Sequence, residues 1–553
     1  MTSSLTQPTE EVGALPPTAP ADSGRAWPGP WLVGLSILAG VVLRAIVLFT
    51  SLGRPDSDEV ISGLMARHLG DAFPAFFWGQ HYGGTIELVP VAASLKLFGS
   101  SVPGLRVPTI VLSVVNAILV WRCARRMMPA GSAKVAGLLA WVWPAAAVWF
   151  GLREQLFYVP TLTLGLVALL LALRLGDPAG WAPIRRQWPQ WAALGLVLGL
   201  GWWTSPNIIY FLVPAALALM ARPGRTRAVE LPPWRGLVVV FGVAVVGALP
   251  WLVTNVGSGF PALHDSGGFP ETGSYPGRVW WFFTHGLPAE MGFRSIGTLA
   301  WIGGALGIAA YLVAVVGLVV ALRAAVVRQA GALGAERTGR WVPAPDAFGF
   351  LAYPLLLALI PFVMAQANLR YLYFLAPFLC LLLARLAVGR RTAAALLVVA
   401  VAVSGVGLAR LHTVSETPGT LFKVGAVGDL SPVIAALDAA QVRSVYADYW
   451  VAYRLVFESD ERILARPSAG THRSPEYRVA VESSPKVAWV VSPGEQKDAL
   501  VATLDQLGVG YQVVDAGEFA VVFTDRPVSP DELPNEARAP AGAEMAPPPD
   551  QNY

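Results

Sequence analysis

The sequence is poor in charged residues and nearly free of cysteine. Only 14% of its 553 residues are Asp, Glu, Lys or Arg, whereas soluble globular proteins carry roughly 25%. This excludes an ordinary soluble domain. The two cysteines, Cys123 and Cys380, lie in or beside apolar segments, which excludes a disulfide framework and a CxxC site. None of the six histidines has the HExxH spacing of a zinc protease.

Long apolar segments dominate instead, with 55% hydrophobic residues and a mean hydropathy of +0.54. A helix of about 20 apolar residues crosses a bilayer, so the sequence predicts an all-α polytopic membrane domain with about 11 transmembrane helices. The predicted spans are 30–50, 104–121, 133–150, 155–174, 191–204, 207–220, 236–254, 296–322, 347–365, 369–388 and 392–410. The apolar piece 88–98 is too short to cross and predicts a juxtamembrane helix.

Arginine clusters in short loops predict the orientation. The net charge is only +4, and its distribution is a topology signal, with no nucleic-acid partner expected. Placing these loops in the cytoplasm puts a first external loop at 51–103 and a second at 255–295 outside. The clustered arginines are Arg122, Arg125, Arg126, Arg174, Arg185, Arg186, Arg222, Arg225, Arg227, Arg235, Arg323, Arg328, Arg337, Arg340, Arg390 and Arg391.

Four regions follow from composition. Residues 1–29, rich in Pro, Thr, Ala and Ser, predict a disordered cytoplasmic tail, and 30–410 the transmembrane domain. Short alternating apolar runs at 444–447, 486–491, 511–514 and 519–523, between helical patterns at 432–440 and 495–507, predict a small extracytoplasmic α/β domain over 411–527. The Pro- and Ala-rich end, 528–553, predicts disorder.

Three carboxylates follow the first span directly: Asp56, Asp58 and Glu59. Such acids at the membrane boundary can act as a base, bind a metal or cap a helix. We expect an amphipathic helix from about Glu59 to Leu69 on the membrane surface, whose first turn Asp58 and Glu59 would equally well cap and solvate. Arg44 within the first span either faces protein or reaches toward this acidic loop.

Other polar residues near the same face are candidates for binding. His81, Tyr82 and Glu87 belong to the first external loop, and a histidine of the second loop could complete a metal site with Glu87 or His81. A satisfied loop histidine is the simpler interpretation. Arg153 and Arg370 lie at external span ends, where guanidinium groups clamp phosphate or anchor at the interface. The aromatic cluster around Tyr449 is interpreted as domain core, with sugar stacking as the alternative.

Several of these segments resemble the type-C-fold (GT-C) glycosyltransferases, among them the protein O-mannosyltransferases and aminoarabinose transferases of glycosyltransferase family 39. The acidic pair Asp58-Glu59 after the first span carries the resemblance. It covers residues 30–410 loosely and 51–126 best. Further matching segments are GQHYGGTIE at 79–87, KLFG at 96–99, LRVP at 105–108 and RYL at 370–372.

The resemblance implies a multi-pass plasma-membrane enzyme of the cell envelope. It would transfer a monosaccharide, such as mannose or a pentose, from a polyprenyl-phosphate donor to a hydroxyl of a protein, lipid or glycan, with inversion. Asp58 would be the catalytic base with Glu59 supporting it, and Arg153 and Arg370 would bind the donor phosphate. Asp56, His81, Tyr82 and Glu87 would bind substrate or supply a second acid.

The site and the C-terminal domain would face outward, among membrane lipids. Glu87 aligns with an acid that helps to bind metal in some relatives, which leaves a divalent metal open. The family's Lys-Pro-Pro after that acid is replaced by Leu88-Val89-Pro90, so no lysine contact to phosphate is expected there.

Two other functions were weighed against this one. Asp56-Ser57-Asp58 matches the DxD metal motif of nucleotide-sugar enzymes, but that motif needs a cytosolic donor, on the side opposite to the predicted one. A transporter or a non-catalytic membrane partner is the alternative outside enzymes. A transporter predicts paired repeats and charges along a membrane path, and the sequence shows no evident repeat.

Overall fold

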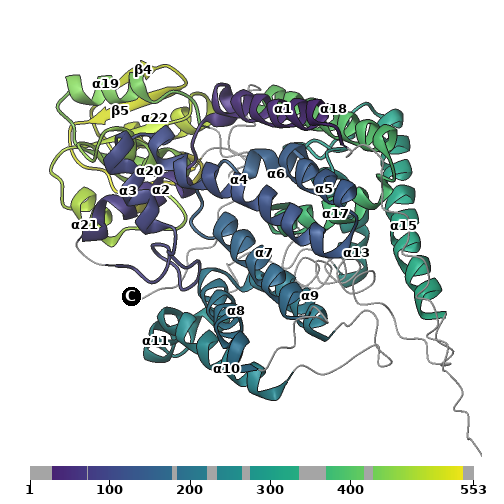
Figure 1. Ribbon diagram of the computed structural model, residues 1–553. Coiled ribbons are helices and arrows are strands. Elements are labelled where there is room, and N and C mark those ends of the chain that lie inside the picture. Colours follow the sequence, from purple (N-terminus) through teal and green to yellow (C-terminus); the bar gives the residue numbers. More distant parts are fainter. Residues whose placement is uncertain are drawn as a thin grey trace, which may run out of the picture.

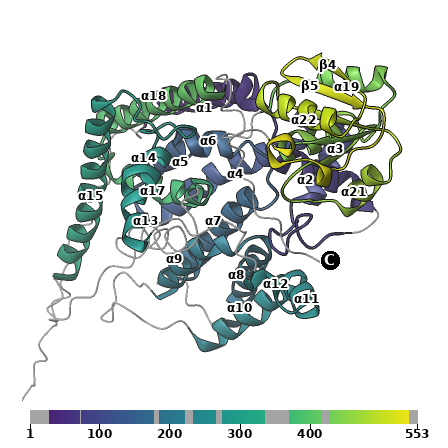
Figure 2. The ribbon, with the colours of Figure 1, turned by 180° about the vertical axis from the view of Figure 1, so that it is seen from behind.

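The computed structural model describes residues 28–70, 73–176, 184–220, 233–264, 274–334, 369–415 and 427–539. A bundle of helices occupies the chain up to residue 415, and a compact α/β domain follows it at one end of the bundle (Figure 1). Figure 2 shows from behind that α15 lies at the end of the bundle farthest from this domain.

The long bundle helices consist of apolar residues, with Pro or Gly at many of their ends and bends. They are α1 (Pro30–Leu48), α4 (Val102–Met127), α5 (Ala130–Val142), α6 (Ala145–Phe150), α7 (Tyr158–Leu175), α8 (Ile184–Thr204), α9 (Ile209–Met220), α10 (Trp234–Gly247), α11 (Leu249–Ser258), α15 (Ala305–Gly334), α17 (Ala376–Leu383) and α18 (Arg390–Ser415). Shorter pieces that matter below are α2 (Ser57–Arg67), η2 (His68–Gly70), α3 (Leu88–Phe98), α14 (Leu287–Glu290) and the 3₁₀ helix η7 (Leu369–Leu375).

Helices occupy every predicted span that the structure describes; only 347–365 lies outside the described residues. Four of the described helices are long and apolar enough to cross a membrane: α1, α4, α7 and α18. The pair α10 and α11, bent by 63°, makes a fifth if it counts as one span. The chain is therefore a helical membrane protein, and the count of eleven crossings stays a prediction. The short helix predicted at 88–98 is α3, with the same bounds.

Arg44 points into the bundle. Helix α1 lies beside α18 in both views (Figures 1 and 2) and packs on α5. The Arg44 guanidinium donates to the Trp141 carbonyl oxygen at 2.7 Å and lies 3.5 Å from the centre of the Trp141 ring. A carbonyl and an aromatic face offset part of the cost of placing a cation in the membrane region, so of the two expectations Arg44 faces protein.

The C-terminal domain is built on a five-stranded sheet in the order β2-β1-β3-β5-β4. Strand β1 is parallel to β2 and β3, whereas β5 is antiparallel to β3 and β4. The strands are β1 (Ser444–Ala447), β2 (Leu464–Pro467), β3 (Val487–Val491), β4 (Tyr511–Ala516) and β5 (Phe519–Thr524). The helices are α19 (Ser431–Ala439), α20 (Tyr449–Glu458), α21 (Pro475–Glu482), α22 (Glu495–Gln506) and α23 (Asn535–Arg538).

Alternate residues of each strand serve opposite faces of this sheet. Val445 packs with α19 and α20, and its neighbour Tyr446 packs with α22 and α23. Helix α18 continues to Ser415, beyond the predicted boundary at 411. The prediction of disorder from 528 was wrong up to 539: Val528, Leu533 and Ala537 are buried against α22.

The predicted surface helix is buried in protein. Helix α2 buries nine consecutive side chains or backbone positions from Glu59 to Arg67's neighbour Ala66, with Asp58 excepted from that run. Its apolar residues share one cluster with α3 and with α20 of the C-terminal domain. At Gly63 an added Cβ would lie 2.5 Å from the Phe457 ring. The expectation that this helix rests on the membrane surface was therefore wrong, because α20 covers it.

Candidate functional site

The start of α2 fixes the three predicted acids in different surroundings. Asp56 is the N-cap of the helix, and its Oδ1 accepts from the Glu59 backbone N–H at 2.8 Å. A carboxylate in this position satisfies an otherwise unpaired N–H. Capping therefore belongs to Asp56, and the two acids of the first turn, Asp58 and Glu59, turn their side chains to other partners.

Glu59 is fully enclosed in an ion pair. Its Oε1 and Oε2 accept from Nε and Nη2 of Arg106 at 2.5 and 2.6 Å, and Oε1 also accepts from the Glu154 backbone N–H at 3.1 Å. Burial alone would raise the pKa of Glu59, but the Arg106 guanidinium holds it below the ordinary value. Glu59 therefore ties α2 to α4 and to the loop before α7, and both of its oxygens are occupied.

Arg153, predicted to bind phosphate, is occupied in the same network. Its Nη2 lies 2.8 Å from Asp56 Oδ2, its Nε lies 3.9 Å from Glu59, and its guanidinium lies over the Trp149 ring. Only 3% of Arg153 is exposed. Burial raises the pKa of Asp56 despite this cation. In this state Arg153 and Asp56 neutralise each other within the protein, and a phosphate would have to break their ion pair.

Glu87 pairs with another acid. It lies against Glu154, and the Thr109 hydroxyl donates to a carboxylate oxygen of Glu154 and lies 3.5 Å from Glu87 Oε1. Burial raises the pKa of Glu87 well above its usual value, and burial raises that of Glu154 to about 8. Two buried carboxyls this close share a proton at neutral pH.

Asp58 differs from its neighbours because it is half-exposed. Its Oδ1 accepts from the Tyr449 hydroxyl of the C-terminal domain at 2.6 Å. Two cations lie within electrostatic reach of the same carboxylate: Arg370 of η7, which bonds the Tyr158 hydroxyl, and Arg473 after β2, which bonds Tyr449. An accessible carboxylate beside two cations can accept a proton while an anion binds next to it.

His81 and Tyr82 lie in the loop that leads to α3, and both are half-buried. Tyr82 interacts electrostatically with Tyr158 and Arg473, which places it beside the Asp58 centre. The loop is fixed by its backbone, since the Gly84 N–H donates to the Thr204 carbonyl oxygen at 2.9 Å. The structure thus groups Asp58, Tyr82 and Arg370, and separates them from the buried Glu59–Arg153 network.

Comparison with known proteins gives a match to a family model over part of the chain and a fold over most of it. The model of the dolichyl-phosphate-mannose-protein mannosyltransferase family matches residues 90–252. The apo crystal structure of ArnT from Cupriavidus metallidurans is similar at a TM-score of 0.54 and 16% identity, over 89% of this chain and 97% of that one. ArnT bound to undecaprenyl phosphate gives 0.51 and 14%, over 92% and 98%. No curated protein sequence matches.

The chain has the GT-C fold of ArnT. The family match begins at Pro90 and includes α4 and α7, so of the resembling segments it covers KLFG at 96–99 and LRVP at 105–108. At 14–16% identity the likeness to ArnT shows the shared fold, and the roles of single residues rest on the geometry of this chain.

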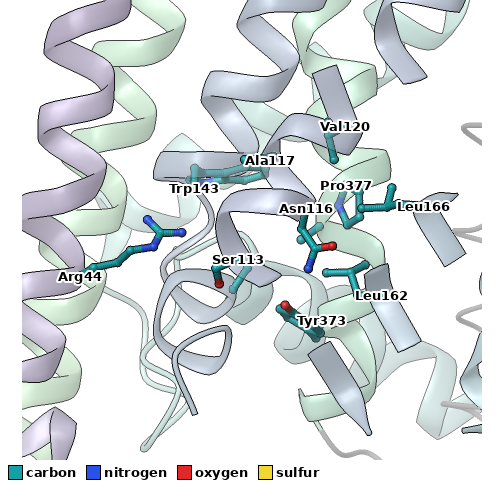
Figure 3. Close-up of a pocket in the computed structure, with 13 residues that line it drawn as sticks. Arg44, Ser113, Asn116, Ala117, Val120, Trp143, Leu162, Leu166, Tyr373 and Pro377 are labelled. Carbon is teal, nitrogen blue, oxygen red and sulfur yellow. The ribbon is translucent and has the colours of Figure 1, made fainter. Parts of the chain in front are cut away.

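A small, mostly apolar space with a few polar side chains lies inside the helical bundle and is too small for a sugar. Figure 3 shows Arg44, Ser113, Asn116 and Tyr373 around it, with the Asn116 amide and the Tyr373 hydroxyl turned toward the same space. Its volume is ≈ 30 Å³, enough for one or two water molecules. Neither amide atom of Asn116 has a hydrogen-bond partner among the described residues, and such waters would supply one.

No three His, Cys, Asp or Glu side chains among the described residues are grouped as metal ligands would be. The described residues therefore do not form the predicted metal site of Glu87 or His81 with a histidine of the second loop. His264 is only partly described, and His285 is stacked on Trp281 at 5.6 Å between ring centres. The acids at the start of α2 lie beside arginines, whose positive charge would repel a metal cation.

Sequence reasoning missed two parts of the site. Arg106 lies in the matching segment LRVP at 105–108 but has no predicted role, although a charged residue inside an apolar span indicates a buried partner. Glu154 is not among the predicted site residues. Tyr449 was interpreted as domain core, and Arg473 was not singled out. Their contact with the Asp58 centre joins positions 391 residues apart, and no local pattern marks such a contact.

Proposed function

We propose that this GT-C enzyme transfers a monosaccharide from a polyprenyl-phosphate carrier to an acceptor hydroxyl, with Asp58 as the general base. The observation that carries the assignment is the half-exposed Asp58 carboxylate beside Arg370 and Arg473, within a set of otherwise enclosed acids. The similarity to ArnT bound to undecaprenyl phosphate supports the lipid-linked donor.

In this mechanism Asp58 takes the proton of the acceptor hydroxyl while its oxygen attacks the anomeric carbon of the sugar. The bond from that carbon to the carrier phosphate breaks, and the phosphate leaves with the electron pair. Arg370 is the residue placed to stabilise the negative charge on the leaving phosphate. Direct displacement of this kind inverts the anomeric configuration.

Glu59 supports the base indirectly. Its ion pair with Arg106 fixes the first turn of α2, so the backbone that carries Asp58 is held rigidly. Asp56 holds the same turn by capping it, and Arg153 in turn neutralises Asp56. We therefore assign the donor phosphate to Arg370 in preference to Arg153, and we keep His81 and Tyr82 as the substrate-side residues of the first loop. Glu87 is enclosed against Glu154 and is left out of this set.

The site and the C-terminal domain are proposed to face the extracytoplasmic side of the plasma membrane. The arginine-rich loops support this orientation by the positive-inside rule. The donor would then lie in the outer leaflet, and the acceptor would be a protein, lipid or glycan of the cell envelope. A mannose or a pentose fits the same chemistry.

The function is tested with purified protein in lipid nanodiscs and synthetic polyprenyl-phosphate donors carrying radiolabelled mannose or arabinose. We expect the label to move to an envelope-derived acceptor from a polyprenyl donor and not from a nucleotide sugar. Solute uptake into sealed vesicles containing the protein, without any transfer of label from either donor, would contradict the proposal and favour a transporter.

A further inference from the structure

The C-terminal domain reaches the Asp58 centre through the first residue of α20. The Ser57 hydroxyl donates to the Tyr449 carbonyl oxygen at 2.6 Å, and the Tyr449 hydroxyl donates to Asp58 Oδ1 at 2.6 Å. Asp448 caps α20 by accepting from the Trp450 N–H at 2.8 Å. The N-terminal ends of α2 and α20 therefore meet, with one backbone contact and one side-chain contact.

Arg473 holds Tyr449 in this position. Its Nε donates to the Tyr449 Oη at 3.2 Å, and its Nη1 donates to Gln80 Oε1 at 3.0 Å. The Arg473 backbone N–H donates to the Tyr453 hydroxyl oxygen at 2.5 Å. A tyrosine hydroxyl has one proton, and because Arg473 donates to its oxygen, that proton is left for Asp58.

The hydroxyl of Tyr449 is a neutral donor. Burial raises the pKa of Tyr449 well above its ordinary value, against the opposing effect of Arg473. Its hydrogen bond to Asp58 occupies Oδ1, while Oδ2 has no hydrogen bond to a described residue. One carboxylate oxygen is thus fixed, and the other is available.

We propose that Tyr449 and Arg473 are positioning residues of the transferase site, which fix Oδ1 of Asp58 and so present Oδ2 to the acceptor hydroxyl. The inference rests on the proposed role of Asp58 as base. It means that the C-terminal domain completes the catalytic site, so a docked domain is a condition for transfer. Four ionisable groups face Asp58 from the elements packed around it: Tyr449, Arg473, Arg370 and Asp56.

The test is Tyr449→Phe, which removes the hydroxyl and keeps the ring. A hydrogen bond to a charged group contributes about 1.5–3 kcal/mol, so we expect kcat to fall on the order of tenfold or more, with KM for the lipid donor little changed. The hydrogen bond that this variant lacks stabilises the charged carboxylate of Asp58 relative to the neutral acid. The acid limb of the pH profile of kcat/KM should therefore move to higher pH in the variant.

Tyr477→Phe is the matched control. The Tyr477 hydroxyl donates to Glu461 Oε2 at 3.0 Å, in the same interface between the domain and the first loop but away from Asp58. We expect this variant to keep the wild-type rate and pH profile. A shift of the profile in Tyr449→Phe alone therefore reports on the base and not on docking or on the amount of folded enzyme.

Asp58→Asn in the same assay separates the two claims. If it is inactive while Tyr449→Phe matches wild type in rate and pH profile, the positioning role is overturned and the base assignment stands. If Tyr449→Phe is faster than wild type, the hydroxyl blocks the acceptor's place, and the positioning role is again overturned. If Asp58→Asn keeps full activity, the proposed function of Asp58 itself fails.

Discussion

Five acids around the start of α2 show how partners decide what a carboxylate can do. Asp56 caps the helix, Glu59 is paired with Arg106, and Glu154 shares a proton with Glu87. Only Asp58 among these is half-exposed and bonded by a neutral donor. Burial and the charge beside it thus make the same chemical group a cap, a structural ion pair or a protonated acid, and Asp58 differs from these in the way its proposed role as base requires.

The Glu154 carboxyl gives a pH-dependent stability. Burial raises its pKa from the ordinary 4.5 to about 8, so the folded protein keeps this proton between those values while the unfolded chain releases it. Unfolding then releases a proton, and stability falls as pH rises through that window. We predict that the unfolding temperature of wild type decreases from pH 5 to pH 8, and that Glu154→Gln reduces this decrease.

The measurement is a thermal unfolding series in detergent over pH 5–9, with Glu518→Gln, an exposed acid of the C-terminal domain, as the control. The control should keep the wild-type slope. An identical slope in Glu154→Gln and wild type would show that Glu154 is ionised in the folded protein at neutral pH.

At the scale of elements, the packing of α20 on α2 brings the residues of the proposed site together. Gly63 allows this approach, because an added Cβ would lie 2.5 Å from the Phe457 ring. Overpacking of such a contact costs about 1–3 kcal/mol. We predict that Gly63→Ala displaces α20, exposes it to proteolysis and lowers transfer, since Tyr449 lies on the same helix.

Gly70→Ala is the control, because nothing lies within 4 Å of its added Cβ. Replacing Phe457 with Leu in the Gly63→Ala background should restore part of the lost transfer by making room. Normal transfer and normal protease resistance in Gly63→Ala would argue against a docked domain as a condition for activity.

Periodicity and apolar length were sufficient to predict most elements. The strand at Ser444–Ala447 and the helix α3 have the predicted bounds, because alternation and a short apolar run are local signals. The strand Leu464–Pro467 was missed, since four residues ending in proline carry too little pattern. The burial of α2 was missed because the surface that covers it, α20, is distant in sequence.

At the scale of the whole molecule, the bundle and the C-terminal domain meet at the proposed site. The proposed orientation can be read from two introduced thiols, because both native cysteines are buried. We predict that a membrane-impermeant maleimide labels Asp498→Cys, on the exposed face of α22, in intact cells. Arg125→Cys, at the end of α4, should label only after permeabilisation. The reverse pattern would place the site in the cytoplasm.

The central claim is that Asp58 removes the acceptor proton, and transfer by Asp58→Asn tests it most directly. The control is Asp515→Asn, an exposed acid on β4 far from the site in sequence. A general base contributes about 10²–10⁴-fold to rate. The account predicts that kcat from a polyprenyl-phosphate donor falls by that factor in Asp58→Asn and stays at the wild-type value in Asp515→Asn. Equal rates in both variants would contradict it.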